Sequence, residues 1–281
     1  MLIPKLKNSS STTSTRPSIE IEVFENPKEW LKDFQAGWLH EYEKTGQFNW
    51  QIYPRPHNRF APSGPGVALA SSRLLLITSA GAYLPASQPP FDSANPLGDY
   101  TTRQLPVSSA FHHISFAHQN IDRQFLQADP QVALPLHHLA DLVQQGIIGD
   151  LALNMVSFMG YQPNILRVAK ELIPDILKIA KAQQVDAALI IPVGPLCIQS
   201  AGLVARALEI NGLATVLTSW DLELTQVTAP PRYTITSLPS GSPLGAPHDS
   251  AQQRRVLEAT LALLEKDSPT GHILSEERFP N

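Results

Sequence analysis

Cysteine is nearly absent from this sequence, and charge is scarce. The chain has one cysteine among 281 residues, Cys197, so no disulfide can form within it and a disulfide-built secreted scaffold is excluded. A lone thiol fits the reducing cytoplasm, which is the localisation we expect. Charged residues make up 16% of the chain and the formal net charge is −4. No basic field is therefore expected to attract nucleic acid or an anionic membrane surface.

Long apolar runs are missing as well. No segment approaches the roughly 18 uninterrupted apolar residues of a membrane-spanning helix, so none is expected. The N-terminal "MLIPKLKN" passes into "SSSTTSTRPS" before a signal-peptide core forms. We expect residues 1–18 to be a disordered tail, because they offer too little apolar surface to offset the entropy of ordering. Residues 19–281 are predicted to form a single α/β domain, with two halves at about 70–160 and 161–270 as the alternative.

The motifs of several common sites do not occur. The chain has neither GxxxxGK[ST] nor a GxGxxG after a strand, and it has no GxSxG. Two histidine pairs, His112-His113 and His137-His138, do not chelate by themselves, because adjacent side chains point to different faces of a strand or helix. We expect neither a cofactor nor a metal ion.

Hydrophobic periodicity and turn residues predict the main elements. Helices are expected at 26–46, with Asn26 as cap, and at 135–146, 162–184, about 197–211 and 249–267; strands are expected at 74–78, 187–193 and 214–219, with weaker candidates at 66–70 and at the start of 111–122. Residues 86–106 read as a long irregular segment. The strand–helix–strand unit at 187–219 indicates a doubly wound, mostly parallel α/β sheet of Rossmann or flavodoxin-like type, with long loop inserts.

Cys197 lies just beyond the apolar strand 187–193 and at the start of the next predicted helix. Ligands of parallel sheets bind beyond the C-terminal ends of the strands, and a helix N-terminus stabilises a thiolate. The position suits a reactive thiol. A free cysteine is also a common buried filler of apolar space, so a structural role is the alternative interpretation.

Several segments in order carry a family resemblance. They include "IPVGPLCIQSAGLVARALEINGLATVLTS" at 191–219, and also 74–106, 115–122, 128–152, 157–160 and 230–265. From about residue 73 to 265 the chain resembles the glycine/sarcosine/betaine/D-proline reductase selenoprotein B family. The resemblance implies an oxidoreductase that cleaves a C–N bond in a small amino acid or amine, with a selenocysteine or cysteine as the attacking group and a dithiol as the electron source.

The family's redox motif corresponds to the turn from Gly194 to Cys197. Many relatives have selenocysteine or cysteine at both ends of this turn, whereas this chain has glycine at the first. A single thiol cannot form an internal disulfide, so the resemblance implies an external thiol or dithiol donor, or a partner subunit that supplies it.

Other candidates follow predicted strands or lie in the long loops. The turn from Ser79 to Gly81 could hold an anion through its backbone N–H groups, or it could be a ligand-free turn. Arg103 could clamp a substrate carboxylate, with Asp99 beside it, or the two could pair to hold a loop.

His118 and Asp122 form a second candidate group. His118 could give a proton to a leaving amine, with Asp122 orienting the ring, or the two could simply brace a loop. Gly194, Gln199 and Arg232 complete the substrate-binding candidates. Arg232, at a strand entry, could reach an anion or cap a helix, and Glu209 is expected to be a solvated charge on a helix.

Two classes of function remain open. The first is a thiol-dependent reductase with Cys197 as nucleophile, acting on a small amino-acid-like substrate. The second is a repurposed, non-catalytic relative that binds a small ligand or a partner protein, and redox-neutral lyase or isomerase chemistry is a further variant.

Overall fold

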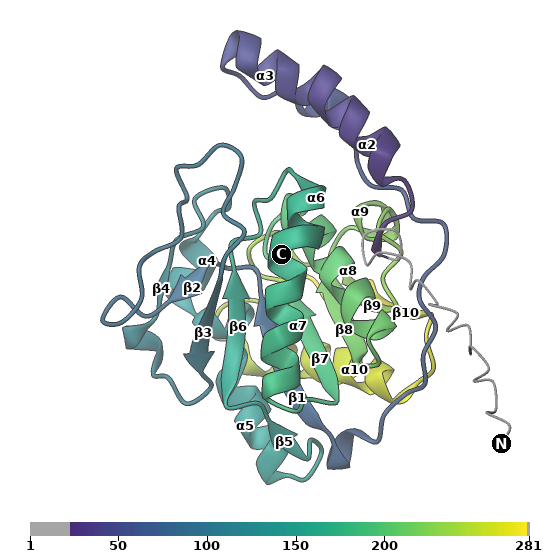
Figure 1. Cartoon of the computed structure of the whole chain (residues 1–281). Coiled ribbons are helices and arrows are strands. Elements are labelled where there is room, and N and C mark those ends of the chain that lie inside the picture. Colours follow the sequence, from purple (N-terminus) through teal and green to yellow (C-terminus); the bar gives the residue numbers. More distant parts are fainter. Residues whose placement is uncertain (1–22, 280–281) are drawn as a thin grey trace, which may run out of the picture.

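The computed structural model describes residues 23–279, so the predicted tail at 1–18 lies outside the described residues. A sheet of eight strands forms its centre (Figure 1). The strand order is β10-β9-β8-β7-β1-β6-β3, and β5 pairs with β1. The strands are β1 (Arg73–Thr78), β3 (Thr102–Pro106), β5 (Asp150–Leu151), β6 (Asn154–Phe158), β7 (Ala187–Ile191), β8 (Ala214–Ser219), β9 (Arg232–Thr236) and β10 (Thr270–Leu274).

The strand order contains a topological switch. All pairings in this sheet are parallel except that of β3 with β6. From β1 the chain passes to β6 on one side of β1 and then to β7 on the other, which is the flavodoxin-like arrangement. The prediction of a doubly wound, mostly parallel α/β fold is confirmed. The switch point lies beyond the C-terminal ends of β1 and β7, where such folds bind ligands.

Helices cover both faces of the sheet (Figure 1). One face packs against α5 (Leu136–Gln144) and α10 (Ser250–Leu261), and the other packs against α7 (Ile173–Ala182) and α8 (Pro195–Ile210). The remaining elements are α2 (Pro27–Asp33), η1 (Phe34–Leu39), α3 (His40–Thr45), η2 (Trp50–Ile52), η3 (Leu69–Ser71), β2 (Ala82–Tyr83), η4 (Phe111–His113), β4 (Ser115–Phe116), α4 (Gln124–Ala128), η5 (Pro130–Val132), α6 (Ile165–Arg167), η6 (Val168–Leu172), α9 (Leu222–Gln226) and η7 (Ala262–Glu265).

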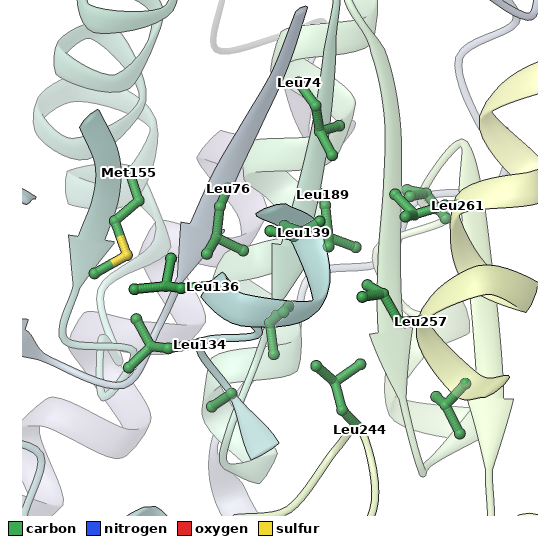
Figure 2. Packing of buried hydrophobic residues seen from close by; sticks show 14 of the residues in the cluster. Leu74, Leu76, Leu134, Leu136, Leu139, Met155, Leu189, Leu244, Leu257 and Leu261 are labelled. Carbon is green, nitrogen blue, oxygen red and sulfur yellow. The ribbon is translucent and has the colours of Figure 1, made fainter. Parts of the chain in front are cut away.

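The core has two parts because strand side chains alternate between the faces. In β1, Leu74 and Leu76 belong to the cluster under α5 and α10, whereas Leu75 and Ile77 belong to the cluster under α7 and α8. Figure 2 shows the first cluster, in which Leu139 from α5 and Leu257 and Leu261 from α10 surround the strand leucines. Burial on both faces explains why β1 and β7 are continuous apolar runs in the sequence.

The N-terminal segment adds a helical arm rich in aromatic residues. It runs through α2, a π-helical turn at η1 and α3, and lies at the top of Figure 1. Trp30, Phe34 and Trp38 stack successively along it. Asn26 does not cap the helix through its side chain, contrary to expectation, and Pro27 occupies the first turn. Within residues 23–279, no helix combines the length and apolar character needed to cross a bilayer.

Several local predictions were wrong. The candidate strand at 66–70 is replaced by the short helix η3, and the irregular segment 86–106 contains the edge strand β3. The strand expected in 111–122 shrinks to β4, because residues 111–113 form a helical turn. The sequence analysis also missed β6, which pairs with β1 in the middle of the sheet.

Candidate active site

Three strand ends meet at the switch point. Ser79 follows β1, Gly160 follows β6 and Gly194 follows β7. The Ser79 hydroxyl accepts a 3.0 Å hydrogen bond from the Val193 N–H, and the Gly160 N–H donates to the Ser79 carbonyl at 3.1 Å. These bonds fix the loops after the three strands against one another and form a rigid floor for a site.

Cys197 occupies the first turn of α8 on this floor and is 1% exposed. Its sulfur lies so close to Gly160 that a Cβ on that glycine would be 2.4 Å away. A Cβ on Gly194 would lie 3.2 Å from the same sulfur and 2.7 Å from Cγ2 of Ile121. Both glycines are therefore required by close packing around the thiol, and Ile121, from the loop after β4, packs against Gly194 beside it.

His118 faces the thiol directly. Its Nε2 atom lies 3.2 Å from Sγ of Cys197, and the ring is 1% exposed. The Asn120 N–H donates to Nδ1 at 3.3 Å, which makes Nδ1 an acceptor. A neutral imidazole with Nδ1 as acceptor carries its proton on Nε2, so the ring presents an N–H donor to the sulfur.

Burial sets the charge state of the pair. Desolvation raises the pKa of Cys197 to about 11, although the Ser79 hydroxyl and nearby backbone N–H groups act in the opposite direction. Desolvation, with the Arg123 charge, lowers the pKa of His118 to about 4. Both groups are neutral at pH 7 in this conformation. The expectation of a helix-stabilised thiolate is wrong here, because burial outweighs the helix N-terminus.

A second loop closes over the same edge. The Gly241 N–H and the Ser240 hydroxyl donate to the Val193 carbonyl at 2.8 and 3.2 Å. Gly241 has φ +87, and a Cβ there would lie 2.9 Å from the Asp122 carbonyl oxygen. The loop at 238–249 thus packs on both the β7 turn and the loop that carries His118.

Comparison with known proteins finds relatives that are all named as subunits of amino-acid reductases. The D-proline reductase subunit gamma of Acetoanaerobium sticklandii is 25% identical over 206 residues, which are 73% of this chain and 84% of that protein. The glycine reductase complex component B subunit gamma of Symbiobacterium thermophilum is 24% identical over 218 residues, 75% of this chain and 49% of that protein. The sarcosine reductase complex component B subunit beta of Peptoclostridium acidaminophilum is 32% identical over 111 residues, 38% of this chain and 25% of that protein.

The chain is related to amino-acid reductase subunits. The resemblance to the selenoprotein B type of reductase is thereby confirmed. The chain spans about half of the glycine reductase subunit and a quarter of the sarcosine reductase subunit. No family model and no solved structure matches it.

Of the other residues predicted for the site, some lie near the thiol and others do not. Asp122 does not touch His118: its carboxylate accepts from the backbone and side chain of Gln124. The idea that Asp122 orients His118 is therefore wrong, since Asn120 occupies Nδ1. Gly81, with φ +65, lies beside His118, because a Cβ there would be 3.1 Å from the His118 backbone nitrogen.

Asp99 and Arg103 hold their own loop. The Asp99 carboxylate accepts from the backbone of Asp92 and Thr101. The Arg103 guanidinium donates to the Pro89, Pro90 and Thr102 carbonyls and to the Thr101 hydroxyl, and it stacks on Phe91. Asp99 and Arg103 form no direct ion pair, and the Arg103 donors are already used within the loop.

Arg232 is a structural residue, not a ligand of the site. It is fully buried at the N-terminal end of β9, and its Nη1 atom lies 2.9 Å from both oxygens of Glu209. Glu209 is correspondingly buried, contrary to the expectation of a solvated charge. The Arg232 guanidinium also donates to the carbonyls of Gly64, Pro65 and Lys266. The pair fastens the segment before β1 to α8 and β9, at the end of the sheet opposite to Cys197.

Gln199 points toward the N-terminal arm. Its amide donates to the Tyr53 hydroxyl at 2.9 Å, and that hydroxyl donates to the Pro163 carbonyl at 2.8 Å. Because the amide nitrogen is fixed as a donor, the buried Oε1 atom of Gln199 is left without a partner among the described residues. Tyr53 and Gln199 thus brace the loop after β6, which bears Gly160.

The sequence analysis missed three residues around the thiol. Gly160, Ile121 and Arg123 received no role. Gly160 follows the unpredicted strand β6, so its place beside β1 could not be inferred. Ile121 and Arg123 flank Asp122, and only the close approach of their loop to α8 gives them importance.

Proposed function

We propose that this chain is a reductase subunit that cleaves a C–N bond in a small amine or amino acid, with Cys197 as the attacking thiol. The observation that carries the proposal is the 3.2 Å contact between Sγ of Cys197 and Nε2 of His118. A thiol that faces an imidazole at the C-terminal edge of a parallel sheet is in a ligand-binding position, and the Nε2 proton of that ring can stabilise the thiolate once it forms. The relatives named as D-proline, glycine and sarcosine reductase subunits support this reaction class.

The first step forms a thioether. The Cys197 thiol, which is neutral in the resting site, loses its proton, and the sulfur attacks the carbon that bears the substrate ammonium group; the C–S bond forms as the C–N bond breaks. The nitrogen leaves with the bonding electron pair and takes up the proton that the thiol lost. Because the leaving group starts as an ammonium, this step requires no further proton from the protein.

The second step requires an external dithiol, because Gly194 provides no second sulfur. One thiolate of the dithiol attacks the thioether sulfur, the S–C bond breaks, and the carbon keeps the electron pair and takes a proton. The second thiol then reduces the mixed disulfide and restores Cys197. The dithiol is oxidised to a disulfide, and the substrate gains two electrons. A partner subunit is the natural source of this dithiol, since relatives are components of reductase complexes.

His118 acts on the nucleophile in this scheme. In an in-line displacement the leaving nitrogen lies on the far side of the attacked carbon from the sulfur. A ring 3.2 Å from the sulfur is therefore placed to donate its Nε2 proton in a hydrogen bond to the thiolate. The earlier expectation of proton transfer to the leaving amine is replaced by this role.

The test follows the Cys197 adduct by mass spectrometry. The wild-type chain is incubated with D-proline, sarcosine or glycine without reductant. The Cys197 peptide is expected to gain a carboxymethyl group from sarcosine or glycine, and the full mass of proline from D-proline, whose nitrogen stays attached through the opened ring. Cys197→Ser should show no adduct and His118→Gln should form it more slowly, whereas His112→Gln, at an exposed histidine, should match wild type. Unchanged adduct formation or turnover in Cys197→Ser would rule out the proposal.

A second candidate is a non-catalytic relative that binds a small ligand or a partner. Burial of Cys197 and its pKa of about 11 favour this candidate. Iodoacetamide labelling across pH separates the two. A labelling midpoint below about 8.5 indicates a reactive thiol, whereas labelling only near pH 11 indicates a structural one.

A further inference from the structure

A cavity of about 460 Å³ lies beside the loop that carries His118. It is formed by the β2–β4 pair, α4 and the turn before β4, at the left of Figure 1. This volume is in the range of small-molecule sites. Its lining residues are Tyr83, Phe111, Ile114, Ser115, Phe116, Arg123, Leu126, Gln127 and Pro130.

Arg123 is the one charged residue in this lining. Its Nη1 atom donates to the Phe116 carbonyl at 3.1 Å, which fixes the side chain. Within residues 23–279, the Nε and Nη2 atoms have no hydrogen-bond acceptor and no carboxylate pairs with the guanidinium. The Nε–Nη2 edge is one of the two edges by which a guanidinium holds a carboxylate with two hydrogen bonds.

The rest of the lining is uncharged. Tyr83, Phe111 and Phe116 are its aromatic residues, and Ser115 and Gln127 are neutral polar residues. An arginine held at one edge and free at the other, in a cavity that aromatic residues help to line, is complementary to a carboxylate on a flat or apolar skeleton. Arg103, the anchor predicted from the sequence, lacks this freedom, since its donors are used by its own loop.

We propose that this cavity binds a small carboxylate with an apolar or aromatic body, held by the Nε–Nη2 edge of Arg123. One loop connects this cavity to the thiol. Phe116 and Arg123 close the loop in which His118 faces the thiol and Ile121 packs beside it. A carboxylate at the Nε–Nη2 edge would hold Arg123 in place and would leave the hydrogen bond from Nη1 to the Phe116 carbonyl intact. The assignment rests on the cavity and its arginine and does not require the proposed reductase activity.

The probe is benzoate, with benzamide as its neutral counterpart and inorganic phosphate as an anion without an apolar body. Binding is measured by titration of backbone amide signals at residues 115–127. Benzoate is expected to bind saturably, in the low millimolar range or tighter, and benzamide and phosphate at least about tenfold more weakly. Equal binding of benzoate and benzamide, or no saturable benzoate binding, would overturn the proposal.

Variants locate the site. Arg123→Gln should weaken benzoate at least about tenfold, and Arg123→Lys should have intermediate affinity, because an ammonium does not make the paired bonds. Arg59→Gln, at a side chain 80% exposed, is the matched control and should bind as wild type. Cys197→Ser should also bind as wild type, so failure of the thiol chemistry leaves this result intact. Wild-type affinity in Arg123→Gln would contradict the assignment, and the comparison of benzoate with benzamide on wild-type protein decides it if Arg123→Gln does not fold.

Discussion

Ile121 packs on Gly194, at the position where a first sulfur of a redox pair would stand. A Cβ on Gly194 would lie 2.7 Å from Cγ2 of Ile121 and 3.2 Å from Sγ of Cys197. The separation from the sulfur is close to the roughly 3 Å between a Cβ and the far sulfur of a disulfide. A sulfur carried by residue 194 would therefore lie within bonding reach of Sγ of Cys197, in the space that a methyl group of Ile121 fills.

A second cysteine should restore that pair. In Gly194→Cys combined with Ile121→Ala, the freed space admits the new sulfur, and we expect a 194–197 disulfide under oxidised glutathione. Intact mass should fall by two hydrogens and thiol titration should give no free sulfur. Ile121→Ala alone should keep one thiol. Two persistent free thiols in the double variant would show that the turn does not have this geometry.

Gly160→Ala should destabilise the fold. The new Cβ would lie 2.4 Å from the Cys197 sulfur and 2.8 Å from the Ser79 Cβ, so the backbone or α8 must shift. We expect a loss of about 1–3 kcal/mol in the free energy of unfolding by urea denaturation, with part of it recovered in the double variant with Cys197→Ala.

Gly37 provides the control for that substitution. A Cβ there would meet nothing within 4 Å, so Gly37→Ala in the helical arm should keep or raise stability. Equal stabilities of the two alanine variants would contradict the close packing around the thiol.

His118 should make the protein sensitive to mild acid. Its folded pKa is lowered to about 4 from 6.5, so the unfolded chain binds the proton first as the pH falls. The contribution is fully present above about pH 6.5 and is lost as the pH falls through about 4, up to about 3 kcal/mol. His118→Gln should show a flatter decline between these pH values in urea titrations. Parallel curves for the two proteins would mean that the buried ring is not held neutral.

The Glu209–Arg232 pair should matter for stability and not for the thiol. Glu209→Gln leaves the buried Arg232 charge without its partner, and we expect a loss of about 3–5 kcal/mol. The joint replacement Glu209→Leu with Arg232→Met should cost less than the sum of the single changes. Iodoacetamide labelling of the folded variants should equal that of wild type. A changed labelling profile would return Arg232 to the candidate site.

The sequence predicts the central elements well for a physical reason. β1, β7 and β8 are apolar runs buried on both faces, and α8 and α10 have clear stops or caps, so local pattern and tertiary role agree. β3 and β10 are edge strands with polar residues or glycine, and their pairing depends on neighbours far along the chain. No local pattern reveals such strands.

The candidate site also combines features that a local sequence pattern predicts with features that depend on distant segments. The place of Cys197 follows from a strand–turn–helix pattern of contiguous residues. Its contact with His118 joins positions 79 residues apart, and its close neighbour Gly160 comes from a third segment of the chain. Arg232 was misplaced because its partner, Glu209, lies on a different element 23 residues away.

The burial of Cys197 also determines how the rate of its chemical labelling depends on reagent concentration. Because the sulfur is 1% exposed, we expect it to react only when the structure around it opens, so the frequency of opening would limit every reaction of the thiol. At high reagent concentration the labelling rate should become independent of the reagent. A partner that held the loop after β4 aside would expose the thiol and would also move His118, which the same loop carries, away from the sulfur.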